Sequence, residues 1–353
     1  MIGCKSSVTF FSNPEIQFLD EHIVTNDSIF SGSSIGGLSG IDYNPISNHF
    51  NLVCDDAYNP RFYQANIAFK DFKIDTIIFE KLTKFDTTSQ LLVNRNVLDL
   101  EGIRMFDNTF LFSSEGSINY QKEPSIFQTD RNGKILYSYT LPSYFLADST
   151  AINQPRHNAV FEGITVSFDK KGFWAATELP LEKDGYEPSY NSNGAPVRLT
   201  YFDFKLKKAI KQFIYSLDKL SKDPKGTFAV NGVTEILQIS KKQFLVLERE
   251  YVAGYGTQGN NVRIYLADFT NATNTLNDVV LKEKHIPATK KLLFTFESVR
   301  SQLTRQIVDN LEGMTFGPKL PNGNLSLLLV ADNNFNPPAQ QLNQFILLEL
   351  KFN

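Results

Sequence analysis

Three segments of the chain begin with a glutamate-glycine pair inside an apolar run. They read LEGI at residues 100–103, FEGI at 161–164 and LEGM at 311–314. Two weaker copies, LSGI at 38–41 and VTEI at 233–236, carry a hydroxyl and a carboxylate near the same point. Gathered by the fold, such side chains would form a ring of hard oxygen ligands, which suits Ca²⁺. We therefore predict a calcium site formed by Ser39, Glu101, Glu162, Glu235 and Glu312.

Polar side chains also stand at the end of the apolar run that follows each of these segments. They are Asp55, Asp56, Glu115, Glu178, Glu248, Arg249, Asp332 and Asn333. In three places an arginine then begins the next run: Arg61, Arg198 and Arg263. A guanidinium group binds carboxylate or phosphate oxygens in bidentate geometry, so the arginines favour an anionic ligand. The alternative is that they form ion pairs with the acids at the second-strand ends.

The elements that must position these residues are short β-strands in groups of four. The anchor residues Ser39, Glu101, Glu162, Glu235 and Glu312 are separated by 62, 61, 73 and 77 residues. Third strands are expected at 61–69, 125–130, 197–204, 262–269 and 344–351, and fourth strands at 76–85, 135–141, 209–217 and 290–296. The last group lacks a fourth strand, which residues 15–24 can supply. This repeat predicts an all-β protein, a β-propeller of five four-stranded blades closed by the N-terminal strand, with six blades as the alternative.

Propeller topology brings the charged residues together. The first strand of a blade lies innermost, and the chain then runs back and forth outward. The start of the first strand, the end of the second and the start of the third therefore lie on one face of the propeller. Several carboxylates around a narrow channel raise one another's pKa unless a counter-charge is present. Protonation, an arginine such as Arg249, or a bound cation would each relieve this repulsion. Alternatively, each glutamate accepts hydrogen bonds from backbone N–H groups where blades meet.

Composition narrows the class of protein. Hydrophobic residues make up 42% of the 353 residues, including 30 Phe and 14 Tyr, which provides ample core material. The net charge of −3 argues against nucleic acid as a partner. No apolar run approaches the roughly 18 residues of a membrane span. The two cysteines, Cys4 and Cys54, suggest neither a disulfide framework nor a zinc site.

The first residues, MIGCKSS, resemble the end of a bacterial lipoprotein signal, in which the cysteine becomes lipidated. We therefore expect a tail at residues 1–13 followed by a single propeller domain at 14–353. The expected location is the cell envelope or the exterior, with a lipid on Cys4 as the means of membrane attachment. The alternative is an ordinary cytoplasmic start. A monomer is expected.

Longer motifs resemble a known family. GGLSGIDYNP, CDDAYNPRFY, FEGI with ATELPL, LVLERE, and NLEGMTFGPKLPNG with VADNNF are similar to the phytase-like family, "esterase-like activity of phytase", from about residue 36 to residue 350. This resemblance implies an exported bacterial propeller hydrolase with phosphoesterase or esterase activity. The ring of Ser39, Glu101, Glu162 and Glu312 also resembles the axial calcium ligands of calcium-activated nucleotidases.

These resemblances suggest calcium-assisted attack of water on a small-molecule phosphate or other ester. Arg61, Arg198 and Arg263 would offset charge, and Asp55 or Glu178 would act as base. The expected substrate-binding residues are Asp56, Glu115, His157, Glu248, Arg249, Asp332 and Asn333. A serine-esterase reading of Gly32-Ser33-Ser34-Ile35-Gly36 is weaker, because no helix follows the motif. The rival class is a non-catalytic binding propeller with a structural calcium.

Overall fold

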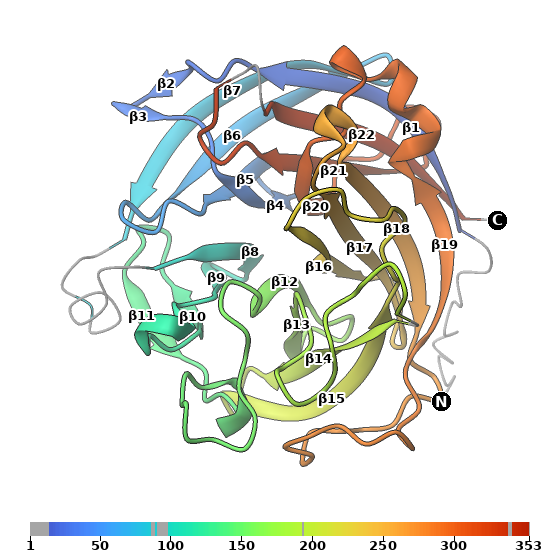
Figure 1. Ribbon diagram of the computed structural model, residues 1–353. Coiled ribbons are helices and arrows are strands. Elements are labelled where there is room, and N and C mark those ends of the chain that lie inside the picture. The colour runs from blue at the N-terminus through green and yellow to red at the C-terminus, as the bar shows by residue number, and fades with distance from the viewer. Residues whose placement is uncertain (1–13, 86–88, 90–97, 193, 338–340, 353) are drawn as a thin grey trace, which may run out of the picture.

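The computed structural model describes residues 14–85, 89, 98–192, 194–337 and 341–352. Five four-stranded antiparallel sheets are arranged in a ring around a central axis (Figure 1). Each innermost strand packs beside the next, and the last packs beside the first. The fold is therefore a five-bladed β-propeller, as predicted. The predicted tail at residues 1–13, which contains Cys4, lies outside the described residues.

The strands of each blade follow one another from the axis outward. In blade 1 they are β4 (Leu38–Asn44), β5 (His49–Cys54), β6 (Arg61–Lys70) and β7 (Lys73–Lys84). In blade 2 they are β8 (Leu100–Phe106), β9 (Thr109–Ser114), β10 (Ser125–Thr129) and β11 (Ile135–Ser138). In blade 3 they are β12 (Phe161–Val166), β13 (Gly172–Thr177), β14 (Ala195–Asp203) and β15 (Lys208–Leu217). In blade 4 they are β16 (Ala229–Gln238), β17 (Gln243–Val252), β18 (Asn260–Asp268) and β19 (Thr289–Thr295).

Blade 5 is built from both ends of the chain. Its inner strands are β20 (Asn310–Phe316), β21 (Leu325–Asp332) and β22 (Asn343–Phe352). The N-terminal strand β1 (Pro14–Val24) pairs antiparallel with β22 along its length, from Pro14 opposite Phe352 to Val24 opposite Asn343. Figure 1 shows this pairing as a dark blue strand beside a red one. The predicted closure is confirmed, and it covers an edge of β22 that would otherwise be free to pair with other chains.

Few elements lie outside the blades. A short hairpin is formed by β2 (Ile29–Phe30) and β3 (Ser33–Ser34), so the serines of the G-x-S-x-G sequence lie on a hairpin rather than on a strand-to-helix elbow. Short 3₁₀ turns occur at Ile118–Tyr120, Ser143–Phe145, Gly256–Gln258, Phe296–Gln302 and Thr304–Gln306. None of the helices within the described residues has the length and apolar character needed to cross a bilayer.

The core lies between neighbouring blades. Alternate residues of each strand face one adjacent blade, so the apolar layers repeat around the ring. Between blades 1 and 2 the layer is aromatic, with Phe62 packed against Phe110 and Phe112. Between blades 4 and 5 it is aliphatic and includes Leu247, Leu311 and Leu329.

A β-bulge interrupts every innermost strand at the position of the repeated motif. In β20, Leu311 pairs with Ala331 and Gly313 with Val330, which leaves Glu312 as the extra residue. The same shift in pairing occurs in β4, β8, β12 and β16. A bulge turns one side chain away from the regular alternation. The Glu-Gly motif therefore marks where each inner strand is bent near the axis.

The glycine of the motif is required by close approach of the inner strands. A Cβ on Gly163 would lie 2.6 Å from the Cα of Glu235, and a Cβ on Gly313 would lie 2.9 Å from the Cα of Gly40. Only a residue without a side chain fits at such distances. The repeat thus has a geometric cause: the glutamate lies on the bulge, and the glycine lets neighbouring inner strands touch.

Candidate metal centre

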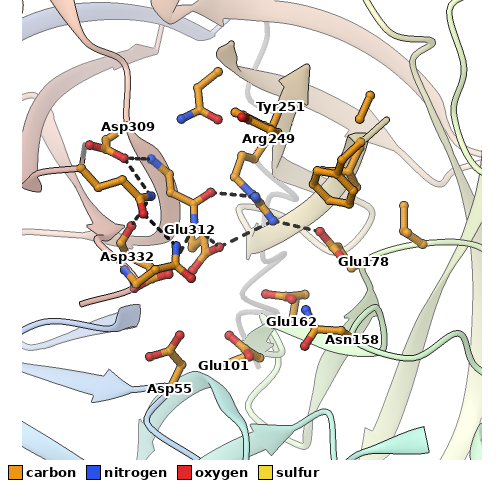
Figure 2. Close-up of a pocket in the computed structure, with 18 of the residues that line it drawn as sticks. Asp55, Glu101, Asn158, Glu162, Glu178, Arg249, Tyr251, Asp309, Glu312 and Asp332 are labelled. Carbon is orange, nitrogen blue, oxygen red and sulfur yellow. Dashed lines mark hydrogen bonds and ion pairs between the residues drawn. The ribbon is translucent and has the colours of Figure 1, made fainter. Parts of the chain in front are cut away.

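An acidic cavity of about 810 Å³ lies on one face of the ring, where first strands begin and second strands end. Figure 2 shows Glu101, Glu162, Glu178, Glu312, Asp55 and Asp332 around it, with Arg249 reaching in from β17. Loops between second and third strands contribute further lining residues, among them Glu187, Gly256 and Asn334. All the acids that line the cavity are Asp55, Asp99, Glu101, Glu162, Glu178, Glu187, Asp309, Glu312 and Asp332.

Three acids in blade 2 lie close enough together to bind one metal ion. Each of Asp99, Glu101 and Glu115 offers a carboxylate oxygen, and these oxygens lie within 4.8 Å of one another. Asp99 and Glu101 are two residues apart at the start of β8, and Glu115 follows β9, the neighbouring strand. One Glu115 oxygen accepts a hydrogen bond from the Val160 backbone N–H, and the other is buried with no partner.

The cavity places carboxyl groups where ionisation is unfavourable. Burial raises the pKa values of Glu101, Glu162 and Glu312 well above their ordinary range, and neighbouring acids add to the effect. The pKa of Asp55 is raised to about 8, first by burial and then by the negative charges of Asp332 and Asp99. Burial likewise raises the pKa of Asp332 to about 6. The cavity therefore contains too little positive charge to balance its carboxylates.

Arg249 supplies part of the missing positive charge. It lies 3.0 Å from Glu178 Oε1 and 3.6 Å from Glu312 Oε1, and its Nη1 donates a 2.7 Å hydrogen bond to Asn310 Oδ1 (Figure 2). Its Nε is buried without a partner. One guanidinium group cannot neutralise this many carboxylates. Arg156, the other arginine lining the cavity, is bound to the Pro180 and Gly185 carbonyls and lies 3.4 Å from Glu187.

These residues fit a divalent cation. The donors are carboxylate oxygens, which hard cations such as Ca²⁺ and Mg²⁺ prefer, and no cysteine lines the cavity among the described residues. A bound cation would give the unpartnered Glu115 oxygen a ligand contact and would lower the raised carboxyl pKa values. The acidic cluster could therefore hold a metal ion.

Many of the predicted site residues meet in the cavity. Of the predicted ligands, Glu101, Glu162 and Glu312 line it, as do the predicted catalytic acids Asp55 and Glu178. Of the predicted substrate-binding residues, His157, Arg249 and Asp332 line it, and Glu115 belongs to the acidic cluster.

The three arginines predicted to be catalytic lie away from the cavity, among ion pairs. Arg198 is fully buried, and its Nε and Nη2 bind the two oxygens of Asp184 at 2.6 and 2.8 Å. Arg61 Nη1 lies 2.8 Å from Asp56 Oδ2, which places this predicted substrate-binding acid in a salt bridge. Arg61 thus pairs with an acid at a second-strand end, as in the alternative interpretation, whereas the partner of Arg198 lies in the loop between β13 and β14.

Blade 4 holds a similar buried network outside the cavity. Arg263 Nη2 lies 2.7 Å from Glu250 Oε2. Glu248, predicted to bind substrate, accepts a hydrogen bond from the Tyr215 hydroxyl at 2.6 Å and lies 2.6 Å from Lys290 Nζ. The arginines lie outside the cavity because third strands are far from the axis. Each third strand is two strand spacings, roughly 10 Å, from the innermost strand, so its side chains lie between or outside blades.

The remaining predicted residues support the walls. Ser39 Oγ donates a 2.8 Å hydrogen bond to the Leu100 carbonyl. The side-chain oxygen of Asn333 accepts hydrogen bonds from the backbone N–H groups of Gly37 and Phe335 at 3.0 and 3.2 Å. Neither residue is among those lining the cavity.

Glu235 occupies a different register position from the other predicted ligands. In β16 the extra residue of the bulge is Thr234, because Val233 pairs with Glu248 and Glu235 with Leu247. Glu235 thus stands where the other blades have glycine. Its carboxylate lies 2.7 Å from Arg104 Nη2 and accepts the Ile164 N–H at 3.1 Å. Thr234, with a buried and unpartnered hydroxyl, takes the position of the motif glutamate.

Sequence reasoning missed several lining residues, namely Asp99, Asn158, Asp309 and Asn310. A signal existed for two of them. Asp99 precedes Glu101, and Asn310 precedes Glu312, by two residues, and such residues face the same side of a strand. Asn310 Nδ2 indeed donates a 2.9 Å hydrogen bond to Glu312 Oε1.

Fold and site together define a five-bladed propeller with an acidic axial cavity suited to a metal ion. A model of the phytase-like family, described as "Esterase-like activity of phytase", matches residues 33–335. The chain belongs to this family, and the resemblance carried by its motifs is confirmed. No curated protein matches the sequence significantly.

The comparison with solved structures finds proteins of low sequence identity. An endo-arabinase from Bacteroides thetaiotaomicron VPI-5482 is 11% identical, with a TM-score of 0.48 over 92% of this chain and 96% of that one. The GH43 β-xylosidase/α-arabinofuranosidase CoXyl43, from a compost microbial metagenome, is 7% identical, with a TM-score of 0.46 over 90% and 92%. The Malassezia sympodialis allergen Mala s 1 is 11% identical, with a TM-score of 0.43 over 96% and 97%.

Proposed function

We propose that the protein is a calcium-dependent hydrolase of phosphate or other esters that acts in the axial cavity. The observation that supports this most is the convergence of buried carboxylates around Asp99, Glu101 and Glu115 with too few positive charges to balance them. A site that disfavours its own ionised groups gains most from a cation. An anionic ester would also be repelled from this cavity unless such a cation were present.

Asp99, Glu101 and Glu115 would hold the ion, with Glu162 and Glu312 as further acids of the same cavity. Bound there, Ca²⁺ would polarise an ester oxygen and lower the pKa of a coordinated water. Because these acids offer only oxygen ligands, the site favours Ca²⁺ over zinc.

The chain's own residues would bind and orient the substrate. Arg249 presents a buried guanidinium group at the cavity wall and is held between Glu178 and Glu312, so it can bind a substrate oxyanion without reorganising. Asp55 lies on the wall with no ion pair among the described residues; a bound cation would lower its raised pKa, and the ionised carboxylate could then accept a proton from the attacking water. His157 and Arg156 also line the cavity and would contact the rest of the substrate.

Export, with a lipid on Cys4 as the anchor, and action as a monomer on a small-molecule ester complete the proposal. Its support is the lipoprotein-like start MIGCKSS. Outside the cell such a site could be weak, because extracellular calcium modules bind the ion with dissociation constants of about 10⁻⁴–10⁻³ M.

The test is hydrolysis of p-nitrophenyl phosphate, p-nitrophenyl acetate, phytate and nucleotides in Ca²⁺ and in EDTA. We expect Ca²⁺-dependent release that falls at least about tenfold in Glu101→Gln. The matched control is Glu250→Gln, which changes a buried acid outside the cavity and should keep the calcium response. Stabilisation by Ca²⁺ without turnover of any substrate would contradict hydrolysis and favour a binding propeller with a structural calcium.

A further inference from the structure

A second cavity, of about 580 Å³, lies between blades 3 and 4 on the face opposite the acidic cavity. Its lining includes the turn from β12 to β13, the start of β15 and the turn from β16 to β17. β13 begins at this cavity and ends beside Glu178 in the acidic one, so the two cavities are roughly 20 Å apart along that strand. The volume lies in the range of about 300–1,000 Å³ that is usual for small-molecule pockets.

The walls of this cavity are aromatic. Trp174 lies between Phe213, with ring centres 5.6 Å apart and planes at 19°, and Tyr201, with centres 5.2 Å apart. Phe244 meets Trp174 edge-on at 5.4 Å. At the margin Phe168 is 56% exposed, which is unusual for phenylalanine. Such walls favour a flat apolar ligand, because aromatic rings pack best against planar groups.

The rim of the cavity is positively charged. Four exposed lysines belong to it: Lys171, Lys211, Lys241 and Lys242. Within the part of the chain that the structure describes, none of them forms an ion pair. The rim aspartates number two, which leaves an excess of two positive charges on a chain whose net charge is −3.

The two rim aspartates are engaged in their own turns. Asp169 Oδ1 accepts hydrogen bonds from Ser167 Oγ and from the Lys171 backbone N–H at 2.7 and 3.1 Å. Asp203 Oδ1 accepts from the backbone N–H groups of Lys205 and Leu206 at 2.9 and 2.8 Å. The lysine charges therefore remain available to a ligand.

We propose that this cavity is a binding site for small aromatic anions, meaning a flat apolar ring system that carries a carboxylate, sulfonate or phosphate group. The ring system would pack against the partly exposed Phe168, Tyr201 and Phe213, beside the buried Trp174, and the anionic group would lie among the rim lysines. The acidic cavity has the opposite charge character and, without a bound cation, repels the same ligand. This site is independent of the proposed hydrolytic one.

The chain contains one tryptophan, so Trp174 reports on this cavity directly. The experiment titrates 1-anilinonaphthalene-8-sulfonate into the full-length protein in EDTA, where the acidic cavity repels anions, with selective excitation of tryptophan. We expect saturable one-to-one binding, with energy transfer from Trp174 to the dye. The uncharged analogue N-phenyl-1-naphthylamine should bind at least about tenfold more weakly. Dye binding that does not saturate, or that leaves Trp174 fluorescence unchanged, would overturn the proposal.

Charge reversal locates the anionic group. The double variant Lys211→Glu and Lys241→Glu should weaken dye binding at least about tenfold. The control, Lys134→Glu and Lys319→Glu, makes the same change in net charge at exposed lysines outside the cavity and should keep the affinity within about twofold. Circular dichroism and melting temperature establish that each variant is folded. Equal loss in both double variants, or equal affinity for the charged and uncharged dyes, would refute an anion site here.

Discussion

Arg249 is the residue on which the charge balance of the axial cavity depends. It contacts Glu178 and Glu312, and its charge partly offsets the rise that burial causes in the pKa values of Glu162 and Asp332. Removing one partner from a buried ionic cluster leaves uncompensated charge, which costs more than the pair itself contributes. Arg249 therefore stabilises the metal-free protein as well as the site.

Replacement of this side chain by an apolar one of similar length tests that role. We expect Arg249→Met to lower the free energy of unfolding by about 3–5 kcal/mol in EDTA at neutral pH. Calcium should restore part of the loss, because the ion supplies the missing positive charge. Urea unfolding with and without Ca²⁺ measures both effects.

Arg300→Met is the matched control, since Arg300 is a buried arginine paired with Glu297 outside the cavity. It should lower stability without changing the response to calcium. If Arg249→Met were as stable as the wild type in EDTA, the cavity acids would not need this counter-charge.

Among the secondary-structure elements, the bulged inner strands determine the shape of the site. In four of the five inner strands the bulge carries Ser39, Glu101, Glu162 or Glu312, and the glycine that follows lets adjacent inner strands approach; in β16 Thr234 and Glu235 take these two positions. The backbone of Glu235 fills the space beside Gly163, so a methyl group there has nowhere to go. Site geometry and blade packing therefore depend on the same two-residue motif.

Gly163→Ala should therefore lower the free energy of unfolding by about 1–3 kcal/mol and weaken calcium binding, since Glu162 would move with the strand. Chemical denaturation and calcium titration calorimetry measure the two effects. The control is Gly323→Asn, at a turn with open space and φ of +86°, a conformation that asparagine tolerates. That variant should stay within about 0.5 kcal/mol of the wild type. An unchanged Gly163→Ala protein would show that the strands can separate at no cost.

Closure of the ring brings acidic groups from several blades together around one axis. Five inner strands from distant parts of the chain surround one axis, and β1 locks the last blade by pairing with β22. The acids are thereby buried together, although each is an ordinary residue in its own blade. Burial and mutual repulsion raise their pKa values in the folded, metal-free protein, whereas the unfolded chain has ordinary values.

Stability without metal should therefore fall as pH rises. A carboxyl group with a raised pKa binds its proton more tightly in the folded state, so its favourable contribution is lost as pH passes through the folded pKa. The ordinary aspartate pKa is 3.8, whereas in the folded protein the pKa is about 6 for Asp99 and Asp332 and about 8 for Asp55, so the loss should extend from about pH 4 to about pH 8. Melting temperatures in EDTA should decline across this range. Saturating Ca²⁺ should reduce the decline. A melting temperature in EDTA that is flat or rises across this range would contradict raised pKa values for the cavity acids in the folded protein.

Local patterns predicted most of the architecture. Strands such as Lys208–Leu217 and Thr289–Thr295 were expected within a few residues of their true bounds, because alternation and turn residues act over short distances. The Glu-Gly repeat predicted five blades and placed Glu101, Glu162 and Glu312 at the axis. In VTEI, where glycine is absent, the register was not visible, and Thr234 rather than Glu235 takes the equivalent place.

By itself, then, the sequence determined the strand pattern, the number of blades and the acids that begin the inner strands, because these follow from residue spacing within each blade. Only the tertiary structure decided which charged groups share the cavity. Arg61, Arg198 and Arg263 have the same chemistry as Arg249, but they lie on third strands, farther from the axis, and form ion pairs with acids beside those strands. Whether a charged side chain reaches the axis depends on its distance from it and on the blade packed beside it, and neither is a property of local sequence.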